Sequence, residues 1–62
     1  MKLIYIDPHC SGLQVTNCPS KDKVEQVLSS KGMNEDECGG EVVHYVFIDS
    51  KGNETKGSLD FT

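Results

Sequence analysis

A β-hairpin is the most strongly constrained structure in this 62-residue sequence. Residues 41–61 contain two strand-like runs, separated by the turn cluster Asp-Ser-Lys-Gly-Asn at residues 49–53. Gly52 is placed for a left-handed backbone conformation, which predicts a three-residue loop built as a type I turn with a glycine bulge. Such a loop sets Asp49 opposite Asn53 and thereby fixes how the two strands pair.

The predicted register gives the hairpin one apolar face. Counting outward from the turn places Phe47 opposite Thr55, Tyr45 opposite Gly57 and Val43 opposite Leu59. The apolar face then consists of Val43, Tyr45, Phe47, Leu59 and Phe61. A shift of one residue would scatter this set over both faces, so the turn and the hydrophobic pattern agree on one register.

The first half of the chain predicts two further strands and a helix. Residues 2–6 are apolar on both faces after Lys2, as in an interior strand, and residues 13–17 alternate between apolar and polar. Ser20 is a candidate N-cap whose hydroxyl would accept a hydrogen bond from the first helical turn. An apolar stripe follows, formed by Val24, Val27 and Leu28.

Gly32 predicts the end of this helix. A glycine in the left-handed conformation after the last turn favours a Schellman closure, in which Met33 folds back on Leu28. Residues 33–40 are then expected to form an acidic loop. The resulting order predicts a single α+β domain over residues 1–62, with one helix packed on a four-stranded, mainly antiparallel sheet in ββαββ order.

The net charge of −4 is concentrated in one segment. Residues 34–41 carry the acidic side chains Glu35, Asp36, Glu37 and Glu41 and no lysine, while the other six acids balance the six lysines. The chain has no arginine, the residue that best recognises phosphates and base edges. Charge and residue type therefore disfavour nucleic-acid binding, and they favour a protein partner with a basic surface.

Catalysis is not expected from this sequence. A chain of this size that is 35% hydrophobic can build one small core, but not a core together with a deep substrate pocket. His44 is predicted to lie across from Ser58 on the hairpin, without a third group to orient it or a cleft to hold a substrate. No catalytic residue and no cofactor is predicted.

The three cysteines leave a second function class open, a small zinc- or thiol-dependent protein. Cys10, Cys18, Cys38 and His44 provide enough ligands for tetrahedral zinc, but the sequence lacks the close cysteine pair that such sites usually have. The opening KLIYIDPHCSGL, with a helix after it, resembles the glutaredoxin-like order of strand, cysteine and helix. That resemblance implies a redox role for Cys10, although Leu13 stands where the second redox cysteine would be.

The expected function is that of a non-catalytic protein-binding module, an inhibitor or adaptor. Val42, Val46 and Ile48 alternate on the hairpin face opposite Tyr45, where they would form a partner surface unless Ile4 and Ile6 complete a second minor core there. The predicted partner-binding residues are Glu35, Asp36, Glu37, Glu41, Val42, Val46 and Ile48. A homodimer through this face or through an edge strand is a further expectation.

A cytoplasmic location is expected, because no segment is long and apolar enough to be a signal peptide or a membrane span. The absence of alanine and arginine fits an AT-rich coding genome, such as many phages have.

Overall fold

The computed structural model of the chain describes residues 1–9 and 12–62. Its strands are β1 (Lys2–Ile6), β2 (Leu13–Asn17), β3 (Val42–Ile48) and β4 (Glu54–Asp60). A 3-10 turn, η1 (Lys21–Lys23), leads into helix α1 (Val24–Ser30), and a second, short helix α2 covers Glu35–Cys38. The α+β class and the strand–strand–helix–strand–strand order are confirmed, with α2 as an addition.

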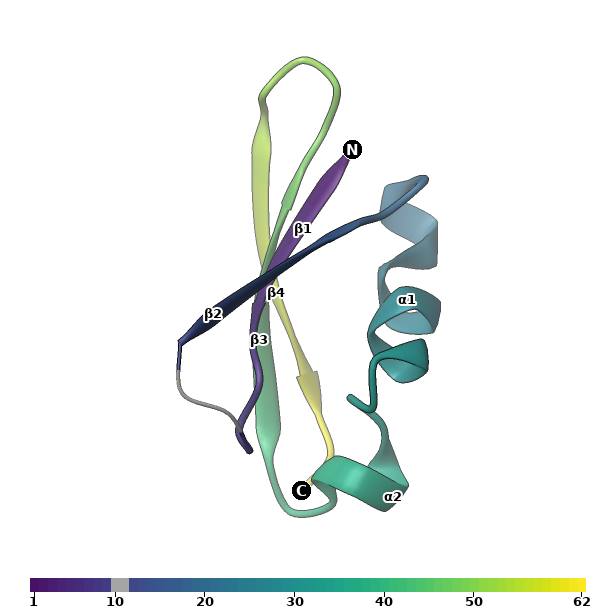
Figure 1. The fold of residues 1–62 in the computed structure, drawn as a ribbon, viewed down its shortest axis with the longest axis vertical. Helices are drawn as coiled ribbons and strands as arrows, with labels where there is room; N and C mark the ends of the chain where they lie inside the picture. Colours follow the sequence, from purple (N-terminus) through teal and green to yellow (C-terminus); the bar gives the residue numbers. More distant parts are fainter. Residues whose placement is uncertain (10–11) are drawn as a thin grey trace.

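The four strands form one antiparallel sheet in the order β2-β1-β3-β4. Strands β2 and β3 both pair with β1 in the antiparallel sense, so they run parallel to each other on either side of it. The chain passes from β2 to β3 through α1. β1 occupies an interior position in the sheet, as its sequence predicts, and its Leu3 and Tyr5 face is the buried one. Both helices of the described residues lie on the same side of the sheet, and no helix of this part of the chain covers the other side (Figure 1).

The hairpin of β3 and β4 has the predicted register. Phe47 pairs with Thr55, Tyr45 with Gly57 and Val43 with Leu59. In the turn, the Gly52 amide donates to the Asp49 carbonyl at 3.0 Å, and the Asp49 amide donates to the Asn53 carbonyl at the same distance. Gly52 has a φ of 86°, which is the left-handed conformation that the predicted glycine bulge requires.

The start of the helical segment differs from the prediction. Ser20 has extended backbone angles, and its hydroxyl caps no amide of the first turn. Instead, its carbonyl accepts the Lys23 amide at 3.1 Å and the Cys18 thiol at 3.0 Å. The chain therefore enters through η1, and the α-helix itself begins only at Val24.

The end of the helix has the predicted Schellman closure. The Met33 amide donates to the Leu28 carbonyl at 2.9 Å, the Gly32 amide donates to the Ser29 carbonyl at 3.1 Å, and Gly32 has a φ of 89°. The following acidic segment is not a loop throughout, because residues 35–38 form α2. The Asn34 side chain caps α2 by accepting the Glu37 amide at 2.9 Å.

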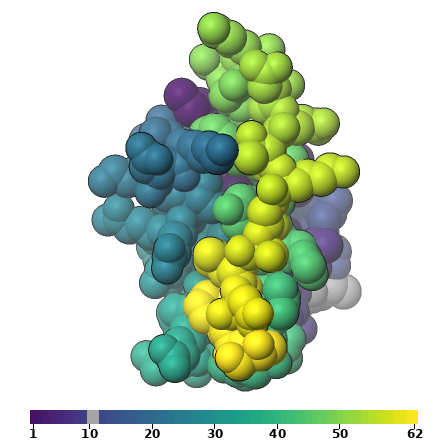
Figure 2. Space-filling view, turned by 180° about the vertical axis from the view of Figure 1, so that it is seen from behind, coloured from purple at the N-terminus to yellow at the C-terminus, as the bar shows by residue number. Residues whose placement is uncertain are grey.

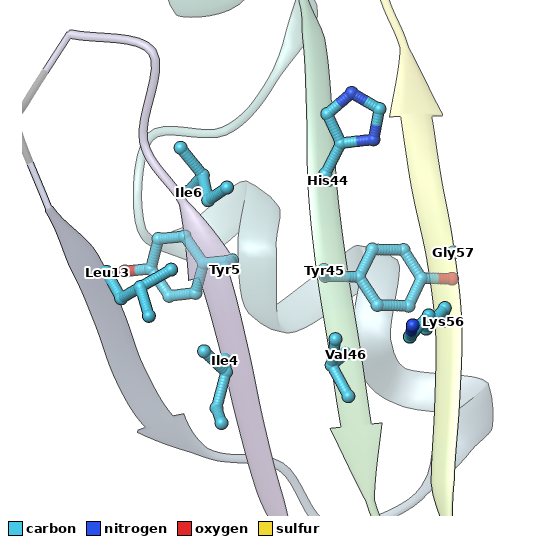
Figure 3. Close-up of a pocket in the computed structure, with 9 residues that line it drawn as sticks. All are labelled: Ile4, Tyr5, Ile6, Leu13, His44, Tyr45, Val46, Lys56 and Gly57. Carbon is cyan, nitrogen blue, oxygen red and sulfur yellow. The ribbon is translucent and has the colours of Figure 1, made fainter.

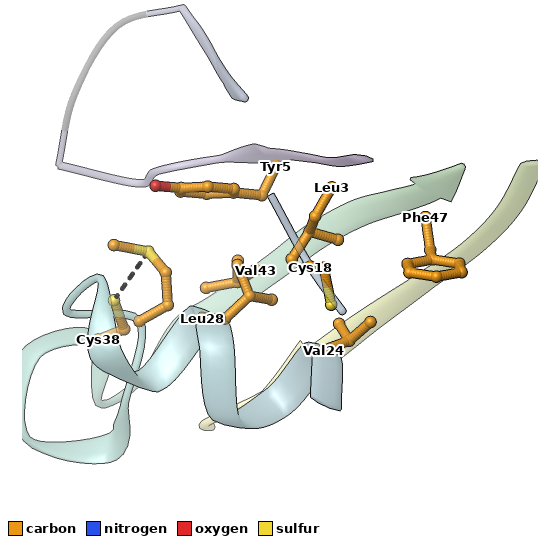
Figure 4. Packing of buried hydrophobic residues seen from close by; sticks show 9 residues of the cluster. Leu3, Tyr5, Cys18, Val24, Leu28, Cys38, Val43 and Phe47 are labelled. Atoms are coloured by element: carbon orange, nitrogen blue, oxygen red, sulfur yellow. Dashed lines mark hydrogen bonds between the residues drawn. The ribbon is translucent and has the colours of Figure 1, made fainter. Parts of the chain in front are cut away.

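The core lies between the sheet and the helical layer. Its buried side chains are Leu3, Tyr5, Cys18, Val24, Leu28, Met33, Cys38, Val43 and Phe47, with Val27, Tyr45, Leu59 and Phe61 packed against them. Figure 4 shows Val24 and Leu28 of α1 facing Leu3, Val43 and Phe47 of the central strands. The predicted contact between helix and hairpin is confirmed, and β1 and two cysteines complete it.

A close contact between Tyr45 and Gly57 generates the first prediction. A Cβ atom on Gly57 would lie 2.5 Å from the Tyr45 Oη and 2.6 Å from its Cζ. Gly57→Ala should therefore displace the ring and lower the free energy of unfolding by about 1–2 kcal/mol. In a Tyr45→Ala background, itself destabilised by about 1–3 kcal/mol because the ring is half-buried, the same change should be neutral or stabilising.

Urea unfolding of the wild type, both single variants and the double variant measures this coupling. Additive effects of the two substitutions would show that the ring does not depend on the glycine.

The turn carboxylate generates the second prediction. The Asp49 Oδ1 accepts the Asn53 and Lys51 amides at 2.9 and 2.8 Å, and these hydrogen bonds hold the pKa of Asp49 below its ordinary value. The ionised carboxylate therefore stabilises the fold above about pH 4, and this contribution disappears as the pH falls through the lowered pKa. An asparagine at this position keeps an acceptor oxygen but does not titrate.

The free energy of unfolding of the wild type minus that of Asp49→Asn should thus be largest near neutral pH and shrink in acid. Chemical denaturation of both proteins over this pH range gives the difference, in which the titration of the other carboxylates cancels. A difference that does not change with pH would contradict the role of the ionised turn carboxylate.

Candidate functional site

The uncovered face of the sheet is the most extensive candidate surface. It carries every second residue of each strand, and we call it the open face: Lys2, Ile4, Ile6, Leu13, Val15, Asn17, Val42, His44, Val46, Ile48, Glu54, Lys56, Ser58 and Asp60. Large aliphatic side chains on this face are highly accessible, with exposures of 66% for Leu13, 63% for Val15 and 48% for Ile6. Exposed aliphatic side chains gathered in this way typically mark a contact surface.

The apolar part of the open face has a defined place within the sheet. Val15, Ile4 and Val46 lie side by side across β2, β1 and β3, and Lys56 continues that row on β4. The edge strand β4 contributes only polar side chains to this face. The open face is therefore apolar over three strands and polar along the β4 edge. Figure 2 views the molecule from that edge, with β4 in yellow running down the front and the hairpin turn at the top.

A hollow of about 200 Å³ lies in the middle of the open face. Aliphatic side chains of Ile4, Ile6, Leu13 and Val46 line it, and His44 lies on the side toward β4 (Figure 3). The hollow is smaller than the 300–1,000 Å³ that is usual for small-molecule sites. Among the described residues, no carboxylate lines it to orient the imidazole, so the arrangement gives His44 no partner for general base chemistry.

The predicted partner-binding residues fall into two groups that lie on different parts of the molecule. Val42, Val46 and Ile48 share the open face, as their alternation in β3 predicts. Ile4 and Ile6 extend the same surface, and the exposure of Ile6 shows that they do not form a covered second core. The acidic side chains lie elsewhere.

The acidic residues mark one end of the molecule, which we call the acidic end: Glu35, Asp36, Glu37 and Glu41. The first three form the first turn of α2, and all four are exposed. Acidic side chains at a helix N-terminus interact favourably with the helix dipole, which gives them a local structural role. Figure 1 places α2 at the end of the sheet near the C-terminus, on the helical side of the molecule and away from the open face.

Leu13 and Val15, the most exposed part of the open face, were not among the predicted partner-binding residues. Leu13 and Val15 were recognisable as neighbours on one side of a strand, because residues 13–17 alternate. The pattern could not tell which side of the sheet they occupy, since an edge strand with two large apolar residues fits either face. The register of β2 against β1 decides it: Val15 pairs with Ile4, on the side opposite the helices.

The described ligands of the zinc alternative do not come together. Cys18 and Cys38 are buried thiols on the helical side of the sheet, while His44 is exposed on the open face. Cys10 lies outside the described residues, as does its predicted redox role. Within residues 1–9 and 12–62, no three side chains of the metal-binding types form a group that could hold an ion.

The environment of Cys38 disfavours the reactive thiolate. Burial is the main cause that raises the pKa of the Cys38 thiol; a hydrogen bond with the Asn34 backbone lowers it, and nearby carboxylates, first that of Asp7, raise it further. The Cys38 Sγ lies 3.9 Å from the Met33 Sδ, the contact that is dashed in Figure 4. It also lies 3.6 Å from the Gly32 carbonyl. These contacts are those of a small core side chain.

The burial of Cys18 and Cys38 predicts slow thiol labelling of the folded protein. In a Cys10→Ser variant, so that only Cys18 and Cys38 are counted, both thiols should react with an aromatic disulfide reagent only through opening of the fold. The rate should rise by roughly 100-fold or more in denaturant, because an opening free energy near 3 kcal/mol gives that protection. Stopped-flow absorbance measures both rates. Rapid labelling of the folded protein, or a zinc ion retained in native mass spectrometry until a chelator is added, would contradict this assignment.

No helix in the described part of the chain has the length and apolar character needed to cross a membrane. Searches against protein-family models, curated proteins and solved structures each returned no match for this chain. The function must therefore be inferred from the open face and the acidic end themselves.

Proposed function

We propose that the chain is a small, non-catalytic protein-binding module that contacts its partner through the open face. The observation that carries this proposal is the gathering of Leu13, Val15, Ile6 and Val42 on one sheet face, with exposures of 37–66%. Burial of apolar surface is the dominant favourable contribution to protein association, at roughly 25 cal/mol per Å² removed from water. An exposed apolar surface of this kind lowers the solubility of the protein unless a partner covers it.

The shape of the open face supports a protein partner over a small molecule. The hollow is shallow and holds about 200 Å³, so a drug-sized ligand would remain largely in water. Small-molecule sites also fix their ligands through several converging polar groups, whereas the hollow is lined mainly by aliphatic side chains. An opposing protein surface can instead contact the whole apolar row of Val15, Ile4 and Val46 at once.

The acidic end supports a second contact with a basic protein surface, as an inhibitor or adaptor would make. Its four carboxylates equal the net charge of −4, because the remaining six acids balance six lysines. Exposed charges concentrated in this way attract a partner of opposite charge and speed its association, an effect that salt screens. The acidic end and the open face lie on different sides, so one chain offers two separate contact surfaces.

Site-specific photo-crosslinking in the source cells tests whether the open face contacts a protein. A benzophenone amino acid at Val15 should form discrete adducts with protein. The same group at Gln26, which is exposed on α1 on the far side of the molecule, should not. In the Val15 background, Val46→Glu should suppress the adduct, and the fold should tolerate this glutamate because Lys56 lies opposite Val46. Equal adduct formation at positions 15 and 26, or none at either, would overturn the proposal.

A further inference from the structure

The open face fits one occupant in particular. Building on the proposed function, we infer that a second copy of this chain covers it. The two sheets pack face to face about a two-fold axis that runs across the strands, between the Val46 and His44 positions. Three properties of the face lead to this arrangement: its size, its charge balance and the order of its side chains.

The size of the open face matches a dimer interface only if nearly all of it is covered. The Cα positions extend over 34 × 22 × 16 Å. Figure 1 is viewed along the shortest axis and shows the sheet edge-on, so the 34 Å and 16 Å extents of the whole molecule set an upper limit on the open face. Their product is roughly 540 Å², while a standard interface takes about 600–1,000 Å² from each partner. The proposed dimer therefore uses the whole face, and its interface lies at the small end of the usual sizes.

An occupant of the whole face must itself be flat and four strands wide, and apolar over three of those strands. A single added strand or a short peptide would cover one row and leave the others in water. A second copy has the required width and outline because it is the same surface. Two sheets packed in this way lie about 10 Å apart, as in a β-sandwich.

The charges on the open face allow a second copy to approach. Lys2 and Lys56 balance Glu54 and Asp60 on this face, although the chain as a whole carries −4. The excess negative charge lies at the acidic end, away from the proposed contact. A basic partner would gain no electrostatic attraction from a neutral face, whereas an identical face brings no net charge that would oppose its approach.

The order of the side chains selects the direction of the two-fold axis. An axis across the strands, between the row of residues that contains Val46 and the row that contains His44, places each strand over the same strand of the second copy. Ile4 then meets Ile6 of the second copy, Val15 meets Leu13, and Ile48 meets Val42. An axis along the strands would instead lay β2 over β4, so that Val15 would face Lys56. The first arrangement brings most of the apolar side chains together and leaves Val46 against His44 and Glu54 against Asp60 toward the β4 edge, whereas the second sets the apolar side chains of β2 against the polar ones of β4.

A charge-pair experiment tests this arrangement. Sedimentation equilibrium of the wild type at micromolar concentration should give twice the chain mass of 6.8 kDa. Ile4→Lys and Ile6→Glu should each give monomers, because each places a charge against an isoleucine. Gln26→Lys on the outer side of α1 should remain dimeric. Val15→Lys is a second variant that should give monomers. Its fold should be unaffected, because the side chain at this position is already 63% exposed.

Mixing the two monomeric variants distinguishes the register. In an Ile4→Lys and Ile6→Glu heterodimer, one contact becomes a lysine–glutamate pair and its symmetry mate stays isoleucine against isoleucine. The mixture should therefore regain dimers, seen as a mass shift and as native mass-spectrometry peaks of the mixed species. Loss of the dimer without recovery in the mixture would overturn the proposed axis. Dimers that persist in both single variants would overturn face-to-face packing in favour of pairing through a sheet edge.

The same experiment separates this inference from the proposed function. A wild-type protein that sediments at 6.8 kDa but forms adducts with another protein from Val15 would overturn self-association and leave protein binding in place. A monomer with no adduct from Val15 would overturn both.

Discussion

The packing of helix α1 on the two central strands is the interaction on which the rest of the structure depends. Val24 and Leu28 enter the core against Leu3, Val43 and Phe47, and this contact joins the two ends of the sequence. A seven-residue helix is about 10 Å long, so it can cover only part of one sheet face. The second face stays uncovered because the described chain offers no other helical segment large enough to pack on it.

How much of this fold the sequence could predict depends on how local the determining interactions are. The hairpin register and the closure of α1 follow from turn glycines at positions 52 and 32, whose left-handed backbone is a property of the local chain. The prediction that the Ser20 hydroxyl caps the helix was wrong: the chain enters through a 3-10 turn, and the hydroxyl accepts no amide of the first turn.

The candidate site shows the same division. The sequence could assign Val42, Val46 and Ile48 to one face of β3, since strand alternation is local. It could not assign Leu13 and Val15 to that face, because the pairing of β2 with β1 involves residues on either side of a loop that contains Pro8 and Gly12. The acidic segment was expected as a loop. Asn34 instead caps a helical turn there, and a cap followed by three carboxylates is a recognisable helix start.

Separate positions for the apolar and the charged surface have a physical consequence for association. Placing four carboxylates beside a dry interface would impose a desolvation cost on the interface. Their position on α2 and at Glu41 lets them stay hydrated while the open face is covered. The His9 Nε2 lies 2.7 Å from the Glu37 carbonyl, a contact that connects the segment after β1 to α2 on the helical side of the sheet. The acidic end is thus held by the fold itself, and it remains accessible to a basic surface whether or not a second copy occupies the open face.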